Sequence, residues 1–260
     1  RMLIDTHCHL DAAEFAVDRR AVIEAASAAG VDAFIVPAVS LASCADVRAL
    51  ATAWPACGPA YGLHPLYLDD LPVDATSRLR DFIAAEMAGP RPPVAIGETG
   101  LDHYLPGYDA GRQQAFFLAQ LRLAREFDLP VIVHVRRAVD DVLACLRRVR
   151  VRGGIAHAFN GSRQQAEQFI GLGFKLGFGG AMTYSGSTRI RRLAAELPLS
   201  ALVLETDAPD IPPSWCPGGR CEPVFLARYA EELAALRGVD VATVRSVTSR
   251  NVVDVLSVAG

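Results

Sequence analysis

The chain has 260 residues, of which 51% are apolar, and its formal net charge is −3. It is long enough to bury a sizeable core, and no apolar run approaches the roughly 20 residues that a membrane-spanning helix needs. The mildly acidic balance excludes the broad basic surface of a protein that wraps duplex DNA, so we expect any nucleic acid to be held through a few phosphates.

Short apolar runs alternate with longer helical patterns along the whole chain. The apolar runs predict strands at residues 3–7, 33–39, 60–63, 94–98, 131–134, 154–157, 174–178 and 202–205. The patterns between them predict helices at residues 19–29, 43–54, 76–87, 111–127, 139–149, 162–172, 188–197 and 225–236. The helix at 111–127 has the clearest pattern, because Phe117, Leu121 and Ala124 recur on one face.

Eight strand–helix units in a chain of this length match the size of a TIM barrel. An open doubly wound sheet is the alternative, but it carries a glycine-rich phosphate loop after its first strand, where this chain has His7-Cys8-His9. Strands that are apolar throughout suit a parallel sheet covered by helices. We therefore predict an α/β fold with one domain over residues 1–260, a single (β/α)8 TIM barrel whose active site lies at the C-terminal ends of the strands.

Five of the six histidines stand at or just beyond the ends of predicted strands, and His7 and His9 are the first of them. Side chains at i and i+2 of an extended chain point the same way. We therefore expect both imidazoles to face one divalent metal ion while Cys8 points away. The alternative is a pair of solvent-exposed histidines at a strand terminus.

Glu98 ends the fourth predicted strand, where an unpaired carboxylate would be costly. Two metal ions held close together need a bridging anion. Many barrel hydrolases use a carboxylated lysine as this bridge, but the single lysine, Lys175, lies near the start of the seventh predicted strand. Glu98 is then the expected bridge, with a structural salt bridge to an arginine as the alternative.

His134 and His157 end the next two predicted strands, and we expect them to hold a second ion as neutral imidazoles rather than to serve as core histidines. Asp207 is expected to bind a metal ion and to accept the proton of a catalytic water, whose pKa a metal lowers towards about 7. Glu205 is expected to orient a neighbouring ligand. The alternative for both acids is that they cap the next helix.

Groups that suit a phosphate surround these residues. Arg136 follows His134 by two positions, and arginine can clamp a phosphate bidentately, with a rim salt bridge as the alternative. His64 is expected to contact a substrate oxygen or to be a turn histidine. Residues 160–162 predict either an anion site or a plain helix cap. No role is predicted for His103.

Charged residues appear by Asp5, unlike the start of a secretory signal peptide, and the six cysteines include no C-x-x-C pair. We expect reduced thiols, a cytoplasmic location, a monomer and no membrane partner. Cys216 and Cys221 lie in a loop rich in proline and glycine, which leaves a disulfide or a metal pair as the alternative.

Six motifs, in this order, resemble those of the TatD family of metal-dependent hydrolases and span nearly the whole chain. They are Asp5-Thr6-His7-Cys8-His9-Leu10-Asp11, Gly62-Leu63-His64-Pro65, Gly97-Glu98-Thr99-Gly100-Leu101-Asp102, His134-Val135-Arg136, His157-Ala158-Phe159-Asn160-Gly161 and Leu204-Glu205-Thr206-Asp207-Ala208-Pro209. The resemblance implies a TIM barrel of the amidohydrolase type. It also implies divalent-metal-dependent cleavage of phosphodiester bonds in a DNA substrate, as a deoxyribonuclease of exonuclease type acting on DNA ends or single strands.

The same resemblance implies two divalent metal ions, with Mg²⁺, Mn²⁺ and Zn²⁺ as candidates, and a role for each matching residue. His7, His9 and Asp207 would hold one ion, His134 and His157 the other, Glu98 would bridge them, and His64 and Arg136 would lie near the scissile phosphate. Asn160, Cys221 and Leu256 depart from the family pattern, and none is an expected ligand. The alternatives are a metal-dependent ester hydrolase, such as a D-aminoacyl-tRNA deacylase, and a binding protein with a structural metal.

Overall fold

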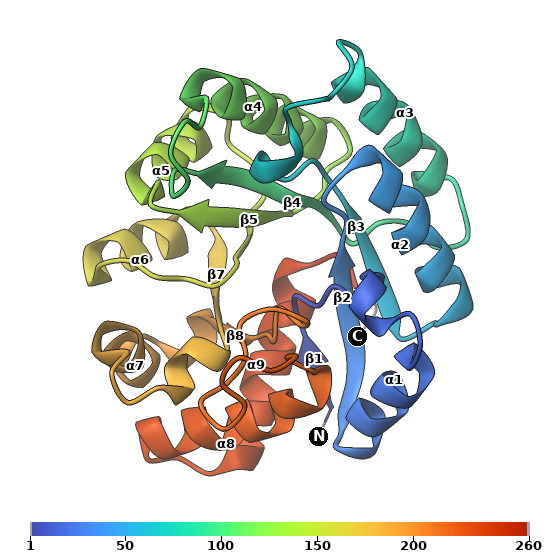
Figure 1. Cartoon of the computed structure of the whole chain (residues 1–260). Helices are drawn as coiled ribbons and strands as arrows, with labels where there is room; N and C mark the ends of the chain where they lie inside the picture. The colour runs from blue at the N-terminus through green and yellow to red at the C-terminus, as the bar shows by residue number, and fades with distance from the viewer. Residues whose placement is uncertain (1, 259–260) are drawn as a thin grey trace.

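The computed structural model describes residues 2–258. Eight parallel strands follow one another around a nearly closed barrel, and helices surround them, which confirms the predicted TIM barrel (Figure 1). The strands are β1 (Leu3–Asp5), β2 (Val31–Pro37), β3 (Cys57–Tyr61), β4 (Ala95–Asp102), β5 (Val131–Arg136), β6 (Gly154–Ala156), β7 (Phe174–Phe178) and β8 (Leu202–Leu204). The chain beyond β1 meets the end of β8, because the Thr6 N–H donates to the Leu204 carbonyl at 3.1 Å.

The helices occupy the places that the sequence predicts, with one addition. They are α1 (Arg19–Ala28), α2 (Leu41–Ala53), α3 (Ala75–Met87), α4 (Ala110–Glu126), α5 (Val139–Arg148), α6 (Arg163–Gly171), α7 (Thr188–Glu196), α8 (Leu226–Arg237) and α9 (Val241–Val255). The predicted elements end at residue 236, so α9 is new. Asp240 caps it by accepting the Thr243 N–H at 2.7 Å.

Two apolar cores hold the barrel together. The larger lies between the strands and the surrounding helices. The smaller fills the barrel interior, where α9 adds Val252 and Val255 and so closes the end opposite the strand tips. Its strand residues include Ile4, Ile35, Ala60, Ala95, Ile132, Ile155 and Val203.

Strand β4 is longer than predicted, and this corrects the position of Glu98. The pairing of β4 with β5 shifts register between Ile96 and Thr99, so Glu98 lies in an irregular stretch within the strand rather than at its end. Gly100 permits this course because its φ is +152° and a Cβ on it would lie 1.9 Å from the His134 carbonyl oxygen.

The structure also bears on membrane-spanning helices, on the cysteines and on Lys175. Within residues 2–258, none of the helices has both the length and the apolar character needed to cross a bilayer. All six cysteines are free thiols, so the alternative disulfide between Cys216 and Cys221 is not formed. The Lys175 ammonium donates to the Ser200 carbonyl at 2.7 Å.

Candidate active site

A cleft of ≈ 380 Å³ opens at the carboxyl ends of the strands. It gathers seven of the eight predicted site residues, and the eighth, His7, lies fully buried and contacts Glu98 and Asp207. The seven that line the cleft are His9, His64, Glu98, His134, Arg136, His157 and Asp207. Residues that are up to 200 positions apart in sequence therefore meet at one place, as expected for a TIM barrel.

The first part of the site lies just beyond β1. The Nε2 atoms of His7 and His9 are 3.2 Å apart, and His7 Nε2 is 3.0 Å from Glu98 Oε2. Asp207 completes the group, with its Oδ1 3.3 Å from His9 Nε2. Cys8 is buried in the larger apolar core, so the chain alternates as predicted and sends both imidazoles to one side.

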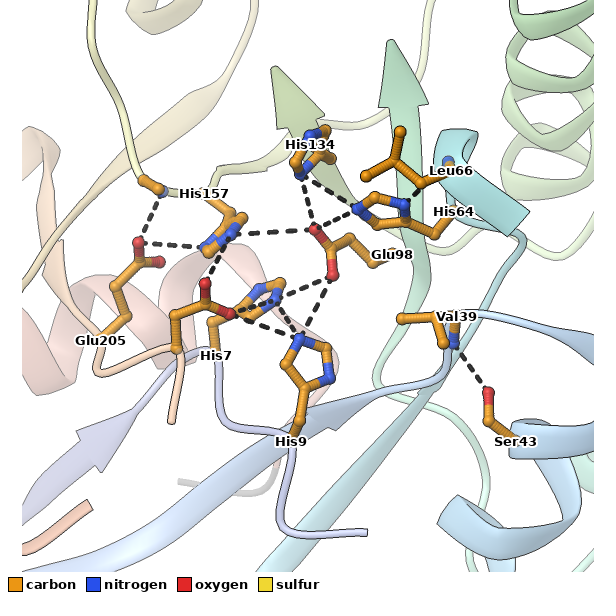
Figure 2. A network of polar contacts seen from close by, with 12 residues as sticks. His7, His9, Val39, Ser43, His64, Leu66, Glu98, His134, His157 and Glu205 are labelled. Atoms are coloured by element: carbon orange, nitrogen blue, oxygen red, sulfur yellow. Dashed lines mark hydrogen bonds and ion pairs between the residues drawn. The ribbon is translucent and has the colours of Figure 1, made fainter. Parts of the chain in front are cut away.

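The second part of the site faces the other oxygen of Glu98. Its Oε1 lies 3.0 Å from His134 Nδ1 and 3.8 Å from His157 Nε2. Figure 2 shows the Glu98 carboxylate between the His7 and His9 rings on one side and the His134 and His157 rings on the other. One buried carboxylate therefore presents a separate oxygen to each pair of histidines.

Two further carboxylates orient the histidines of the second part. Asp102 Oδ2 is 2.8 Å from His134 Nε2, and Glu205 Oε1 is 3.0 Å from His157 Nδ1. When Asp102 and Glu205 hold the ring protons on these outer nitrogens, the opposite nitrogens of the neutral rings present their lone pairs towards Glu98, across the place where an ion would lie. His134 Nδ1 and His157 Nε2 can therefore act as metal ligands.

Asp102 belongs to this site, although the sequence predicts no role for it. A signal was present, because Asp102 closes the motif that contains Glu98 and lies four residues beyond it, on the same face of an ideal strand. The predicted orienting role of Glu205 matches its place beside His157, and its Oε1 also accepts the Ala158 N–H at 2.5 Å.

His64 differs from the other cleft histidines in its hydrogen bonding. The Leu66 N–H donates to His64 Nδ1 at 3.0 Å, which leaves the proton of the neutral ring on Nε2. That nitrogen lies 3.4 Å from Glu98 Oε1 and 3.2 Å from His134 Nδ1. His64 is therefore suited to donate a hydrogen bond into the cleft, while it also caps the turn that begins at Pro65.

Arg136 lies at the rim, where its guanidinium carbon is 3.6 Å from the centroid of the Tyr104 ring. None of the ion pairs found within residues 2–258 involves Arg136, so its charge is free to meet an anion. The helix cap predicted at residues 160–162 is present, and the anion site there stays a prediction. Ser162 and Gln165 form a capping box at the start of α6.

The electrostatics of the site favour a bound cation. Burial alone would raise the pKa of Glu98, but the neighbouring His7 and His64 hold the pKa of this carboxyl well below its usual range. Burial alone would also raise the pKa of Asp207, but the neighbouring His157 and His9 outweigh burial and lower this pKa. Two ionised carboxylates therefore persist in a buried place that a divalent ion would neutralise.

The donor atoms also fit a metal centre by kind and by spacing. Imidazole nitrogens and carboxylate oxygens are ligands for Zn²⁺ and similar divalent ions. Ligands that surround one ion at about 2.1 Å are separated from one another by about 3.0–3.4 Å. His7, His9, Glu98 and Asp207 show contacts of 3.0–3.5 Å among these donor atoms.

Comparison with known proteins identifies the family of the chain. Residues 4–257 match the family model described as TatD related DNase. The chain is 41% identical to the uncharacterized metal-dependent hydrolase YjjV of Escherichia coli strain K12, over 90% of each chain. It is 31% identical to the 3'-5' ssDNA/RNA exonuclease TatD of Rahnella sp. strain Y9602, over 94% of each chain.

A crystal structure shows the same fold. The structure of YjjV, a TatD homolog from Escherichia coli K12, matches with a TM-score of 0.94 at 38% identity and covers 99% of this chain and 98% of that one. The metal-dependent hydrolases among these relatives and the buried cluster of histidines and carboxylates point to the same chemistry. The chain belongs to the TatD family of metal-dependent hydrolases.

Proposed function

We propose that this protein is a phosphodiesterase that uses two divalent metal ions to remove nucleotides from the end of a single-stranded DNA. The observation that carries the proposal is the division of the Glu98 carboxylate between two groups of histidines. Two bound ions would act as Lewis acids on the phosphate and would lower the pKa of a catalytic water. The rest of the chemistry follows from the residues around them.

Each residue of the cluster has a place in this scheme. His7, His9 and Asp207 would hold one ion, His134 and His157 the other, and Glu98 both. We assign His64 to the substrate rather than to an ion, because the Leu66 N–H donates to its Nδ1 and leaves the proton of the neutral ring on Nε2.

Proton transfer and phosphate binding fall to groups at the edge of this cluster. Asp207 directs Oδ1 to His9 and Oδ2 to His157, so it lies between the two groups and can accept the proton of the attacking water. His64 Nε2 donates to a phosphate oxygen, and Arg136 binds a second one from the rim.

The charges around the cleft support binding of a chain end. Asp11, Glu14 and Asp210 line the cleft on the loops that follow β1 and β8, while Arg136 lines it from β5. In an eight-stranded barrel, β5 lies opposite β1, so these three carboxylates and the Arg136 guanidinium stand on opposite sides of the cleft. A polyanion that enters past Arg136 meets repulsion at the far wall, which favours a terminus in the cleft over an uninterrupted strand.

The test compares linear and circular single-stranded DNA of the same sequence, with the protein loaded with Mg²⁺, Mn²⁺ or Zn²⁺. We expect the linear molecule to be shortened stepwise and the circular one to persist. Glu98→Ala and Asp207→Asn should each lower the rate at least about a hundredfold, because each removes a metal ligand. Glu167→Gln, on the exposed surface of α6, is the control for a lost carboxylate.

Three results would overturn parts of this proposal. Unchanged activity in both Glu98→Ala and Asp207→Asn would rule out this centre as the site of reaction. Equal cleavage of the circle would rule out dependence on a chain end. Turnover of a D-aminoacyl-tRNA ester without any phosphodiester turnover would assign the centre to the alternative ester hydrolase.

A further inference from the structure

Three exposed tyrosines stand on two loops beside the cleft. The exposed fractions are 54% for Tyr67, 42% for Tyr104 and 44% for Tyr108. Among residues 2–258, these are the large exposed aromatic side chains. Tyr67 follows His64 by three residues, and Tyr104 and Tyr108 follow Asp102 by two and six residues. We call Tyr67, Tyr104 and Tyr108 the tyrosine rim.

Tyr108 covers His103, the histidine for which the sequence predicts no role. The two rings are stacked, with centroids 4.3 Å apart and planes within 6° of each other. The His103 side chain is only 11% exposed, so one face of Tyr108 is occupied and its exposure comes from the remainder of the ring. The His103 N–H donates to the Arg136 carbonyl at 2.9 Å, which ties this stacked pair to β5.

Tyr104 connects the tyrosine rim to the candidate metal ligands. Its N–H donates to Asp102 Oδ1 at 3.0 Å, and the other oxygen of that carboxylate faces His134. The guanidinium groups of Arg136 and Arg137 lie 3.6 Å and 4.7 Å from the centroid of the Tyr104 ring. Two positive charges and an aromatic ring therefore lie together at the basic side of the cleft.

Tyr67 stands inside the cleft mouth. Its ring meets His64 edge to face, with centroids 5.7 Å apart and planes at 87°. It lines the same cleft as His134, Arg136 and Glu98. Of the three tyrosines, Tyr67 lines the cleft itself, and Tyr104 adjoins it through Arg136, which lines it too.

We infer that the tyrosine rim is a stacking surface for the unpaired bases of a single-stranded nucleic acid, placed next to the phosphate that is cut. The inference rests on the proposed function. Proteins that bind single strands combine positive charges along the backbone with aromatic rings on which the bases stack, and this surface has both. Bases within a duplex already stack on one another, so the surface selects single strands without reading their sequence.

The experiment compares two oligonucleotides of equal length and charge with the metal-loaded protein. One is an oligothymidylate, and the other has base-free residues at the three nucleotides nearest the cleaved end. We expect the KM of the wild-type protein to be about tenfold lower for the oligonucleotide that keeps its bases. Tyr108→Ala and Tyr67→Ala should each reduce this preference.

Matched variants separate stacking from folding. Tyr108→Phe and Tyr67→Phe keep the rings and should keep the preference, and Val73→Ala, at another exposed position, should not alter it. Equal KM values for the two oligonucleotides in the wild-type protein, or a full preference in both alanine variants, would overturn the inference.

Failure of the proposed function gives a different result. The wild-type protein would then cut neither oligonucleotide, and anisotropy of the same labelled oligonucleotides would report binding to the metal-loaded protein instead. Tighter binding of the molecule with bases, lost in Tyr108→Ala and Tyr67→Ala, would support the stacking surface without nuclease activity. Equal binding of the two molecules would overturn it.

Discussion

Glu205 lies behind His157, with its Oε1 3.0 Å from Nδ1 of the ring. The same carboxylate is confined from the side of β7, because a Cβ on Gly177 would lie 2.3 Å from Glu205 Oε2. Burial alone would lower the pKa of His157, but Glu205 and Asp207 outweigh it and raise the pKa to about 10. Glu205 therefore holds the ring in this direction and favours its protonated form in the metal-free chain.

Replacement of Glu205 by Gln should weaken metal binding by about 10- to 100-fold, because the carboxylate that orients His157 loses its charge while the side chain keeps its size. The measurement is the affinity of the metal-free protein for Zn²⁺, by competition with a chelating dye. Glu167→Gln, far from the cleft, should bind as the wild-type protein does. Unaltered affinity in Glu205→Gln would show that His157 does not depend on this carboxylate.

Replacement of Gly100 by Ala should lower the free energy of unfolding by about 3 kcal/mol or more, because the new Cβ would lie 1.9 Å from the His134 carbonyl oxygen and the residue has positive φ. Urea unfolding measures the change. The matched control is Gly111→Ala in the first turn of α4, where the nearest atom lies 3.6 Å from the new Cβ. That control should leave stability unchanged or raise it by up to about 1 kcal/mol; equal effects of the two variants would contradict the prediction.

Much of the fold could be predicted because each barrel strand is a short apolar run followed by a helical pattern. Helix α9 was missed because its sequence is rich in valine and threonine, which have low helix propensity, and its stability comes from packing on the barrel interior. The full length of β4 was missed because Gly97 and Gly100 are typical of strand ends. Local sequence does not reveal that neighbouring strands support such a stretch.

The candidate site was predictable to the extent that strand ends converge in a barrel. This rule brings His134 and His157 together without any knowledge of their side-chain directions. It gave no role to Asp102, because a pairing with His134 depends on which ring nitrogen faces it. The same rule predicts nothing about Tyr104 and Tyr108, because the course of their loop depends on contacts that the spacing of residues in the sequence does not reveal.

Thiol reactivity should distinguish Cys216 from the other five cysteines. Cys216 is partly exposed, while the others are buried, and burial raises the pKa of Cys44, Cys57 and Cys221 to about 12. We expect one thiol per native chain to react rapidly with a disulfide reagent at pH 8, and six to react in denaturant. Cys216→Ser should abolish the rapid reaction, whereas rapid reaction of two thiols in the native wild-type chain would contradict the buried place of Cys221.

Removal of metal should lower the melting temperature, because the unfolded chain lacks the assembled ligands and binding therefore stabilises the folded state alone. An ion supplied at about 100 times its Kd adds about 2.7 kcal/mol. In a chain of this size that raises the melting temperature by about 5–10 °C over the chelated protein. Glu98→Gln should show a much smaller rise, since Glu98 contacts both His7 and His134, and Glu167→Gln should match the wild-type protein. Identical melting of the wild-type protein with chelator and with metal would mean that the histidine and carboxylate cluster does not hold an ion.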